Sequence, residues 1–158
     1  MTTRDKGVIE LRRRIAAAPE TVFSFFVDPA RYRMWQGVDA ELDPRPGGLF
    51  RVTTTGHSRH VARGSYLEVD PPRRLVFSWG WEPIPGLGEG QHEVQPGAST
   101  VEVSLVADGD GTVLVVRHTG LPTDASCRFH NFGWETTLGR LVVVAEGGDP
   151  GPYPFANL

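Results

Sequence analysis

The chain has 158 residues, which is enough for one domain with a sizeable core. Hydrophobic residues make up 39% and charged residues 22%, which is typical of a globular protein and excludes a disordered chain. The formal net charge is -3, so we expect no nucleic-acid or membrane partner, because both need a concentrated basic face.

The N-terminal segment predicts one strand followed by two short helices. Residues 8–15 alternate apolar and polar side chains, as a half-buried strand does. Residues 19–27 place apolar side chains on one helical stripe. Asp28 and Pro29 end this helix, because the residue before a proline is held away from helical angles. Residues 30–35 then form a second short helix.

From residue 47 onward, glycine and proline separate short alternating segments, which predicts an antiparallel meander. The strands are expected at residues 48–55, 61–69, 74–81, 99–107 and 112–119. Residues 83–98 hold three prolines and four glycines, and they predict a mobile surface loop near the mouth of a cavity rather than a core element.

The last regular segment predicts a long helix over residues 124–146. Its apolar positions recur on one side of a helix and its start can be capped by Thr123 or Asp124. Gly133, just before Trp134, suggests close packing of this helix on the sheet. Residues 147–158 are too rich in proline and glycine for regular structure.

These elements permit few compact arrangements. The sheet must cover an apolar face, and the final helix is the only long amphipathic element available. A curved antiparallel sheet that grips this helix leaves space between them, closed at one end by the two short helices. We therefore expect a single α+β domain over residues 1–158, with a core of about 8–146 and an apolar pocket.

Cys127 is the only cysteine, so no intrachain disulfide can form, which fits a reducing compartment. The first residues are polar and lack the apolar stretch of a signal peptide. No apolar run approaches the ~20 residues that span a bilayer. We expect a cytoplasmic protein.

Several segments together resemble one known family. They are Ala18-Pro19-Glu20-x-Val22-Phe23, Asp28-Pro29, Gly47-Gly48-x-Phe50-Arg51, Val69-Asp70-Pro71-Pro72-x-Arg74-Leu75-Val76-Phe77, Thr112-x-Leu114-x-Val116-x-His118-x-Gly120-Leu121 and His130-x-x-Gly133-Trp134. Their order and spacing are similar to small bacterial members of the activator of Hsp90 ATPase homologue-like family, in the START/Bet v 1-like (SRPBCC) superfamily. The resemblance implies a helix-grip fold. Its members include hydrophobic-ligand carriers, polyketide cyclases and aromatases.

Aromatic side chains from several elements are candidates to line the pocket, although any one of them can simply fill the core. The expected ligand-binding set is Phe26, Trp35, Phe50, Tyr66, Phe77, Trp79, Trp81, His118, His130, Trp134 and Leu138. His118 shares an apolar strand face, and His130 lies on the inner stripe of the final helix. Each imidazole could transfer a proton or could hold the structure through hydrogen bonds.

The histidines do not predict a metal site. None forms a His-x-x-x-His or His-Glu-x-x-His pair, and a single cysteine rules out a multi-thiolate site. The glycines at 86, 88 and 90 lie in a proline-rich segment with no helix after them, so they do not form a dinucleotide fingerprint. We expect no metal and no cofactor.

Three functions stay open. The first is a non-enzymatic binder of a small hydrophobic or aromatic molecule. The second is a polyketide cyclase/dehydratase-like enzyme that uses His118, His130 or Tyr66 as acid and base. The third is a co-chaperone-like protein-interaction module, and a homodimer also stays open. An enzyme needs two titratable groups near one reacting atom, whereas a binder needs only apolar walls and an orienting polar group.

Overall fold

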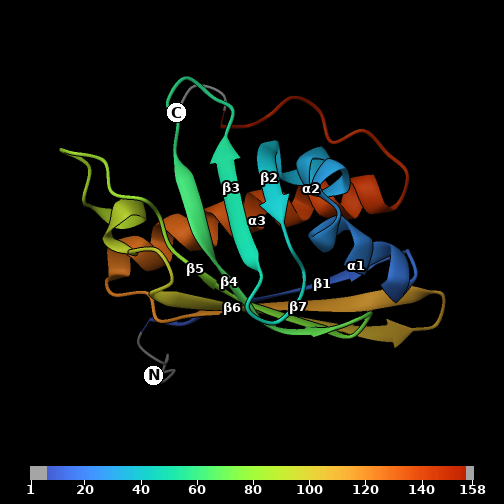
Figure 1. The fold of residues 1–158 in the computed structure, drawn as a ribbon. Coiled ribbons are helices and arrows are strands. Elements are labelled where there is room, and N and C mark those ends of the chain that lie inside the picture. The colour runs from blue at the N-terminus through green and yellow to red at the C-terminus, as the bar shows by residue number, and fades with distance from the viewer. Residues whose placement is uncertain (1–6, 156–158) are drawn as a thin grey trace, which may run out of the picture.

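A seven-stranded antiparallel sheet curves around one long helix in the computed structural model, which describes residues 7–155 (Figure 1). Neighbouring strands follow the order β1-β7-β6-β5-β4-β3-β2. The strands are β1 (Ile9–Ile15), β2 (Val38–Leu42), β3 (Leu49–Thr54), β4 (Val61–Asp70), β5 (Arg74–Trp79), β6 (Ser99–Asp108) and β7 (Gly111–Thr119). The helices are α1 (Pro19–Val27), α2 (Pro29–Gln36), the 3-10 helix η1 (Gly90–Glu93) and α3 (Asp124–Ala145). The predicted α+β class and helix-grip architecture are confirmed.

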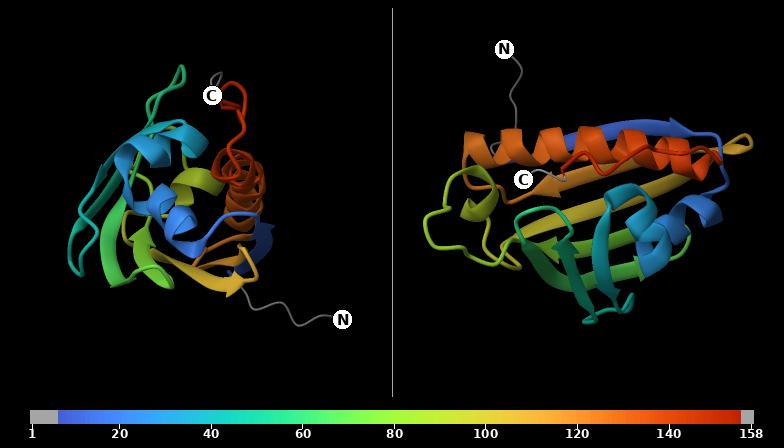
Figure 2. Two further views of the ribbon diagram at one scale, coloured as in Figure 1. Left: turned by 90° about the vertical axis from the view of Figure 1, so that its right-hand side faces the viewer. Right: turned by 90° about the horizontal axis from the view of Figure 1, so that it is seen from above.

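Helix α3 lies along the concave face of the sheet, and α1 and α2 close one end of the enclosed space (Figure 2). Strands β6 and β7 supply much of the inward face, because every second residue of β6 from Ser99 to Leu105 is buried. Leu138 and Leu141 of α3 are fully buried in the same core. The inward-facing residues of the strands therefore pack against the apolar stripe of α3, as the sequence predicts.

The ends of the helices follow local chemistry. Asp28 caps α2, since its side chain accepts from the backbone N–H groups of Ala30 and Arg31. Thr123, not Asp124, caps α3, where it forms a reciprocal capping box with Ser126. No helix among residues 7–155 is both long and apolar enough to cross a membrane.

The edge strand β2 was not predicted from the sequence. It is five residues long, and Val38, Ala40 and Leu42 alternate with the exposed Asp39 and Glu41, so this short period-two pattern is the signal that could have found it. It forms because it pairs with β3, with Glu41 opposite Arg51 and their side chains 2.9 Å apart in an ion pair. Long-range pairing thus stabilises a strand that the local alternation already favours.

The prediction that residues 83–98 lie outside the core is wrong for the second half of the segment. Residues 90–93 form η1, His92 is buried, and Val94 is fully buried within the core cluster. Helix η1 packs on α3, and the backbone N–H of Trp81 donates to the Val94 carbonyl at 2.7 Å. Strand β5 accordingly ends at Trp79, two residues before the predicted end. The predicted mobility of this segment stays a prediction.

The tail after α3 is irregular through residue 155, as expected, yet it has a defined position. The Arg140 guanidinium donates to the Trp35 carbonyl and to the carbonyls of Pro150, Gly151 and Pro152, at 2.8–3.2 Å. Tyr153 then packs on Gly37, where a Cβ atom would collide with the tyrosine ring and where φ is +69°. Glycine is required there for both reasons.

Replacing Arg140 with methionine should release the tail while the fold persists. The change keeps much of the apolar stem but removes every guanidinium hydrogen bond to the tail and to α2. Chymotrypsin should then cleave after Phe155 faster than in the wild type, as measured by intact mass. The exposed Arg128 on the same helix offers a matched control, Arg128→Met. Equal cleavage rates in the two variants would show that Arg140 does not hold the tail.

Candidate functional site

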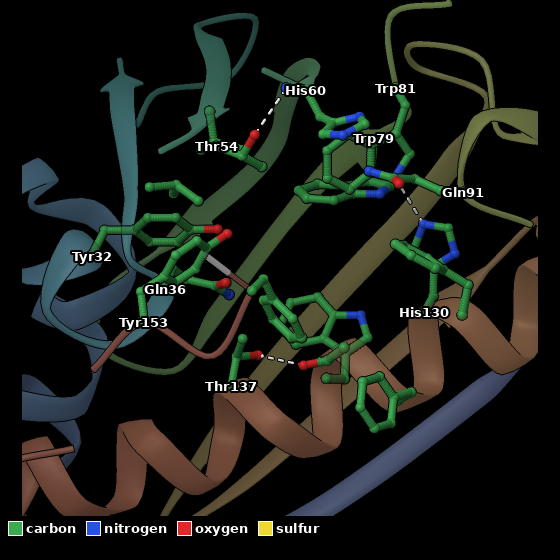
Figure 3. Close-up of a pocket in the computed structure, with 17 residues that line it drawn as sticks. Tyr32, Gln36, Thr54, His60, Trp79, Trp81, Gln91, His130, Thr137 and Tyr153 are labelled. Atoms are coloured by element: carbon green, nitrogen blue, oxygen red, sulfur yellow. Dashed lines mark hydrogen bonds between the residues drawn. The ribbon is translucent and has the colours of Figure 1, made fainter. Parts of the chain in front are cut away.

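A cavity of about 350 Å³ lies between α3, the tail and the part of the sheet formed by β2, β3 and β5. Its walls are mostly apolar and strongly aromatic, with side chains from α2, β5, α3 and residues 149–155 (Figure 3). The aromatic lining comprises Tyr32, Trp79, Trp81, Phe129, Phe132, Trp134, Tyr153 and Phe155. The polar lining comprises Gln36, Thr54, His60, Gln91, His130 and Thr137.

The structure divides the eleven expected ligand-binding residues between this cavity and the packed core. Trp79, Trp81, His130 and Trp134 line the cavity. The others are buried outside the lining: Phe26, Trp35, Phe50, Tyr66, Phe77, His118 and Leu138. Phe50 and Phe77 stack with ring centroids 4.3 Å apart, and the Trp35 indole N–H donates to the Phe25 carbonyl at 2.8 Å. Aromatic packing thus fills the end near α1 and α2.

Several lining residues were not predicted from the sequence. Tyr32 lies one helical turn before Trp35, and this spacing is the signal that could have found it. Tyr153 and Phe155 belong to the proline-rich tail, which has no periodicity. They reach the cavity only through the tertiary contact with Arg140 and Gly37.

His118 of β7 is held by a chain of hydrogen bonds that fixes its tautomer. The Trp134 indole N–H donates to His118 Nδ1 at 3.1 Å, so Nδ1 must be the unprotonated nitrogen. His118 Nε2 then donates to Ser99 Oγ at 2.8 Å, and Ser99 donates onward to the Trp79 carbonyl at 2.8 Å. Burial, followed by the neighbouring His130, lowers the pKa of His118 well below its usual value.

His130 is also hydrogen-bonded through both ring nitrogens, but in this pair the helix α3 supplies the imidazole and the segment after β5 supplies the indole. Its Nδ1 lies 2.7 Å from the Ser126 carbonyl, which can only accept, so Nδ1 carries the proton. Its Nε2 accepts from the Trp81 indole N–H at 3.1 Å. Burial lowers the pKa of His130 to about 4, although the hydrogen bond to Ser126 opposes this. Both imidazoles are therefore neutral near pH 7, with both nitrogens already used.

A second histidine pair, His60 and His92, lies beside Trp81. His92 Nδ1 is 3.0 Å from the Glu82 carbonyl and must donate to it, so His92 Nε2 accepts from His60 Nδ1 at 3.0 Å. His60 Nε2 is left as a hydrogen-bond acceptor on a residue that lines the cavity. Burial, together with His92, lowers the pKa of His60. The sequence did not indicate this pairing.

Tyr66, the third catalytic candidate, is fully buried beside Phe50 and Phe77, and its hydroxyl has no hydrogen-bond partner among the described residues. Burial raises the pKa of Tyr66, and the nearby Asp43 raises it further. Because Tyr66 is not part of the lining, the structure does not bring it together with His130 at one reacting atom. Within residues 7–155, no three His, Cys, Asp or Glu side chains gather as a metal site.

Comparison with known proteins identifies the relatives of this chain. The family model described as activator of Hsp90 ATPase homolog 1-like protein matches residues 16–146. An AHSA1-like protein from Rhizobium etli, solved by NMR, is 41% identical over 96% of this chain and 90% of its own, with a TM-score of 0.67. The crystal structure of CalU16 from Micromonospora echinospora is 30% identical over 89% of this chain and 76% of its own, with a TM-score of 0.67.

An HSP90 activator from Plasmodium falciparum is 22% identical over 87% of this chain and 95% of its own, with a TM-score of 0.68. At this level of identity the similarity concerns the fold alone. A search among curated proteins found no match.

Replacing Trp134 should show how much the helix depends on its indole. Trp134→Ala should lower the free energy of unfolding by about 3–5 kcal/mol, because a large buried ring is lost. Trp134→Phe should cost about 1–3 kcal/mol, because His118 Nδ1 then has no donor. Urea unfolding followed by circular dichroism measures both. Phe132→Ala, which truncates a 62% exposed ring on the same helix, is the control. A Trp134→Phe variant as stable as the wild type would contradict the role of the hydrogen bond.

The low pKa of His130 predicts a loss of stability in acid. Its folded pKa is about 4, while an unfolded histidine titrates near 6.5. Between these values the unfolded chain binds a proton that the folded chain does not, so stability falls as the pH falls through this window. His130 should contribute a loss of roughly 3 kcal/mol between pH 6.5 and 4 and no slope above it. Urea titrations of the wild type and His130→Gln test this, and parallel curves for the two proteins would refute it.

Proposed function

This chain belongs to the family of activator of Hsp90 ATPase homolog 1-like proteins, and from the geometry of its pocket we propose that it binds a small, largely apolar aromatic molecule without transforming it. The observation that supports this most directly is the cavity of about 350 Å³ with aromatic walls. Its size lies within the range of small-molecule pockets, which are mostly apolar with a few polar groups.

Gly133 helps to keep this space open. It lines the cavity from α3, and a Cβ atom at this position would meet nothing within 4 Å. The expected close packing of the helix on the sheet at Gly133 is therefore wrong. A glycine in the middle of a helix costs roughly 0.5–1 kcal/mol relative to alanine. Here the missing side chain leaves cavity volume instead of allowing two backbones to approach.

The state of His118 and His130, the two histidines proposed as acid and base, supports binding over catalysis by these residues. A general base needs a free lone pair within reach of the proton that it removes. In His118 and His130 the accepting nitrogen already receives an indole N–H, and the protonated nitrogen donates to Ser99 or Ser126. Both side chains serve the structure in this arrangement. The cyclase-like alternative would require these hydrogen bonds to break during turnover.

A pair of glycine substitutions on α3 tests the proposal. Gly133→Phe places a ring in the cavity, whereas Gly139→Phe adds the same ring at an exposed position with open space around it. The neutral fluorophore N-phenyl-1-naphthylamine should bind the wild type and Gly139→Phe with a micromolar Kd, which corresponds to about 8 kcal/mol. Gly133→Phe should bind about tenfold or more weakly, a loss of about 1.4 kcal/mol or more.

The melting temperatures control for misfolding. Both substitutions replace a helical glycine with a residue of better helix propensity, so neither should lower the melting temperature. Equal affinity in the two variants would place the fluorophore outside the cavity and would sink the proposal. Native mass spectrometry of freshly purified wild type would show directly whether a small molecule co-purifies.

A further inference from the structure

The pocket contains no formally charged side chain. None of the 17 lining residues drawn in Figure 3 is Asp, Glu, Lys or Arg. The nearby Arg140 lies outside the lining, where its Nε and Nη1 donate to backbone carbonyls of α2 and the tail, although its charge reaches Tyr153 and lowers the pKa of that phenol against the effect of burial. For a cavity that opens between a helix, a sheet and a tail, this absence is informative, because charged residues make up 22% of the chain.

The titratable lining residues are neutral as well. Burial lowers the pKa values of His60 and His130, and both carry a protonated nitrogen that a neighbour accepts from. Burial raises the pKa values of Tyr32 and Tyr153, so their phenols keep their protons. Near pH 7, no group on the wall can neutralise an ionised ligand.

A charged ligand would therefore lose its hydration without direct contact with a counter-charge on the wall. Burying an unpaired carboxylate or ammonium costs several kcal/mol, whereas a neutral carbonyl or hydroxyl needs only one hydrogen bond to be satisfied. The walls thus discriminate against fatty acids, phosphates and amines of otherwise suitable shape.

Among the described residues, unpaired polar groups are nevertheless available: His60 Nε2 and the Trp79 indole N–H belong to lining residues, and three further polar side chains gather at one end. Tyr32, Gln36 and Tyr153 lie together on the side of the cavity away from Trp81 and His130 (Figure 3). Within residues 7–155, none of these three side chains makes a hydrogen bond, so their phenol and amide groups can bind a ligand atom. The flat faces of Trp79 and Trp134 contribute to the wall between β5 and α3.

We propose that the pocket selects an uncharged, planar aromatic molecule whose carbonyl or hydroxyl oxygen faces Tyr32, Gln36 and Tyr153. This inference rests on the proposed ligand-binding function and narrows it to a chemical class. A ketone, quinone or phenol fits this description, and a carboxylate or sulfonate does not.

Two fluorophores with one skeleton test the charge selection. N-phenyl-1-naphthylamine is neutral, and 1-anilinonaphthalene-8-sulfonate is the same molecule with an added sulfonate. The neutral probe should bind the wild type about tenfold or more tightly, because the sulfonate has no partner in the pocket. Gly133→Phe serves to subtract binding outside the cavity. Equal or tighter binding of the sulfonate within the cavity would overturn the proposed charge selection and leave ligand binding intact.

The polar end is tested with a third probe, the neutral ketone 6-propionyl-2-(dimethylamino)naphthalene. Replacing both phenols, Tyr32→Phe with Tyr153→Phe, should weaken this ketone by roughly 3- to 10-fold, as expected for one lost hydrogen bond. Binding of N-phenyl-1-naphthylamine should change less than about twofold, since it has no carbonyl. Tyr66→Phe is the matched control, because Tyr66 is buried outside the lining.

An unchanged ketone affinity in the double variant would overturn the assignment of the polar end. The same would follow if Tyr66→Phe weakened the ketone as much as the double variant. If none of the three probes binds the wild type, the ligand-binding proposal fails and this inference fails with it. If the charge selection alone fails, both naphthylamine probes still bind in the cavity. This result differs from a failure of ligand binding, in which no probe binds.

Discussion

Two crossed hydrogen bonds between indoles and imidazoles join the long helix to the sheet. Trp134 of α3 donates to His118 of β7, and Trp81, just after β5, donates to His130 of α3. All four side chains are buried, so each polar atom must find its partner inside the protein. Because the two bonds run in opposite directions between the same two layers, a shift of α3 along its axis would break both. They fix the register of the helix, and the position of the cavity follows from it.

The same two hydrogen bonds help to explain why the interior is divided into a packed core and a cavity. On one side, Leu138, Leu141 and the stacked rings of β3 and β5 form a packed core. On the other, Gly133 leaves the helix without a side chain where it faces the cavity. An apolar space of this size sacrifices packing contacts, and the satisfied polar bonds beside it help to keep the layers from closing. A polar contact thus preserves an apolar site.

Much of this architecture could be predicted because it depends on local pattern. Alternation in β6 and β7, the break at Asp28 and Pro29 and the stripe of α3 are visible in the sequence, and the fold follows from them. Local pattern does not show which inward residues fill the core and which face a cavity. Phe77 and Trp79 share one face of β5, yet only Trp79 lines the pocket. The His60–His92 pair and the tail depend on distant partners, so their roles were visible only in three dimensions.

The proposed ligand binding would couple to folding through this cavity. A ligand that enters it meets only the folded chain, since the unfolded chain has no such wall, and it therefore stabilises the protein by mass action. The tail adds to this coupling, because Arg140 ties it to α2 and α3 while Tyr153 and Phe155 face the same space. A ligand that contacts these rings also holds the tail against Gly37. Residues 149–155 should then become more ordered as a ligand fills the pocket. The position of α3 should stay the same, because the hydrogen bond between Trp134 and His118 fixes its register.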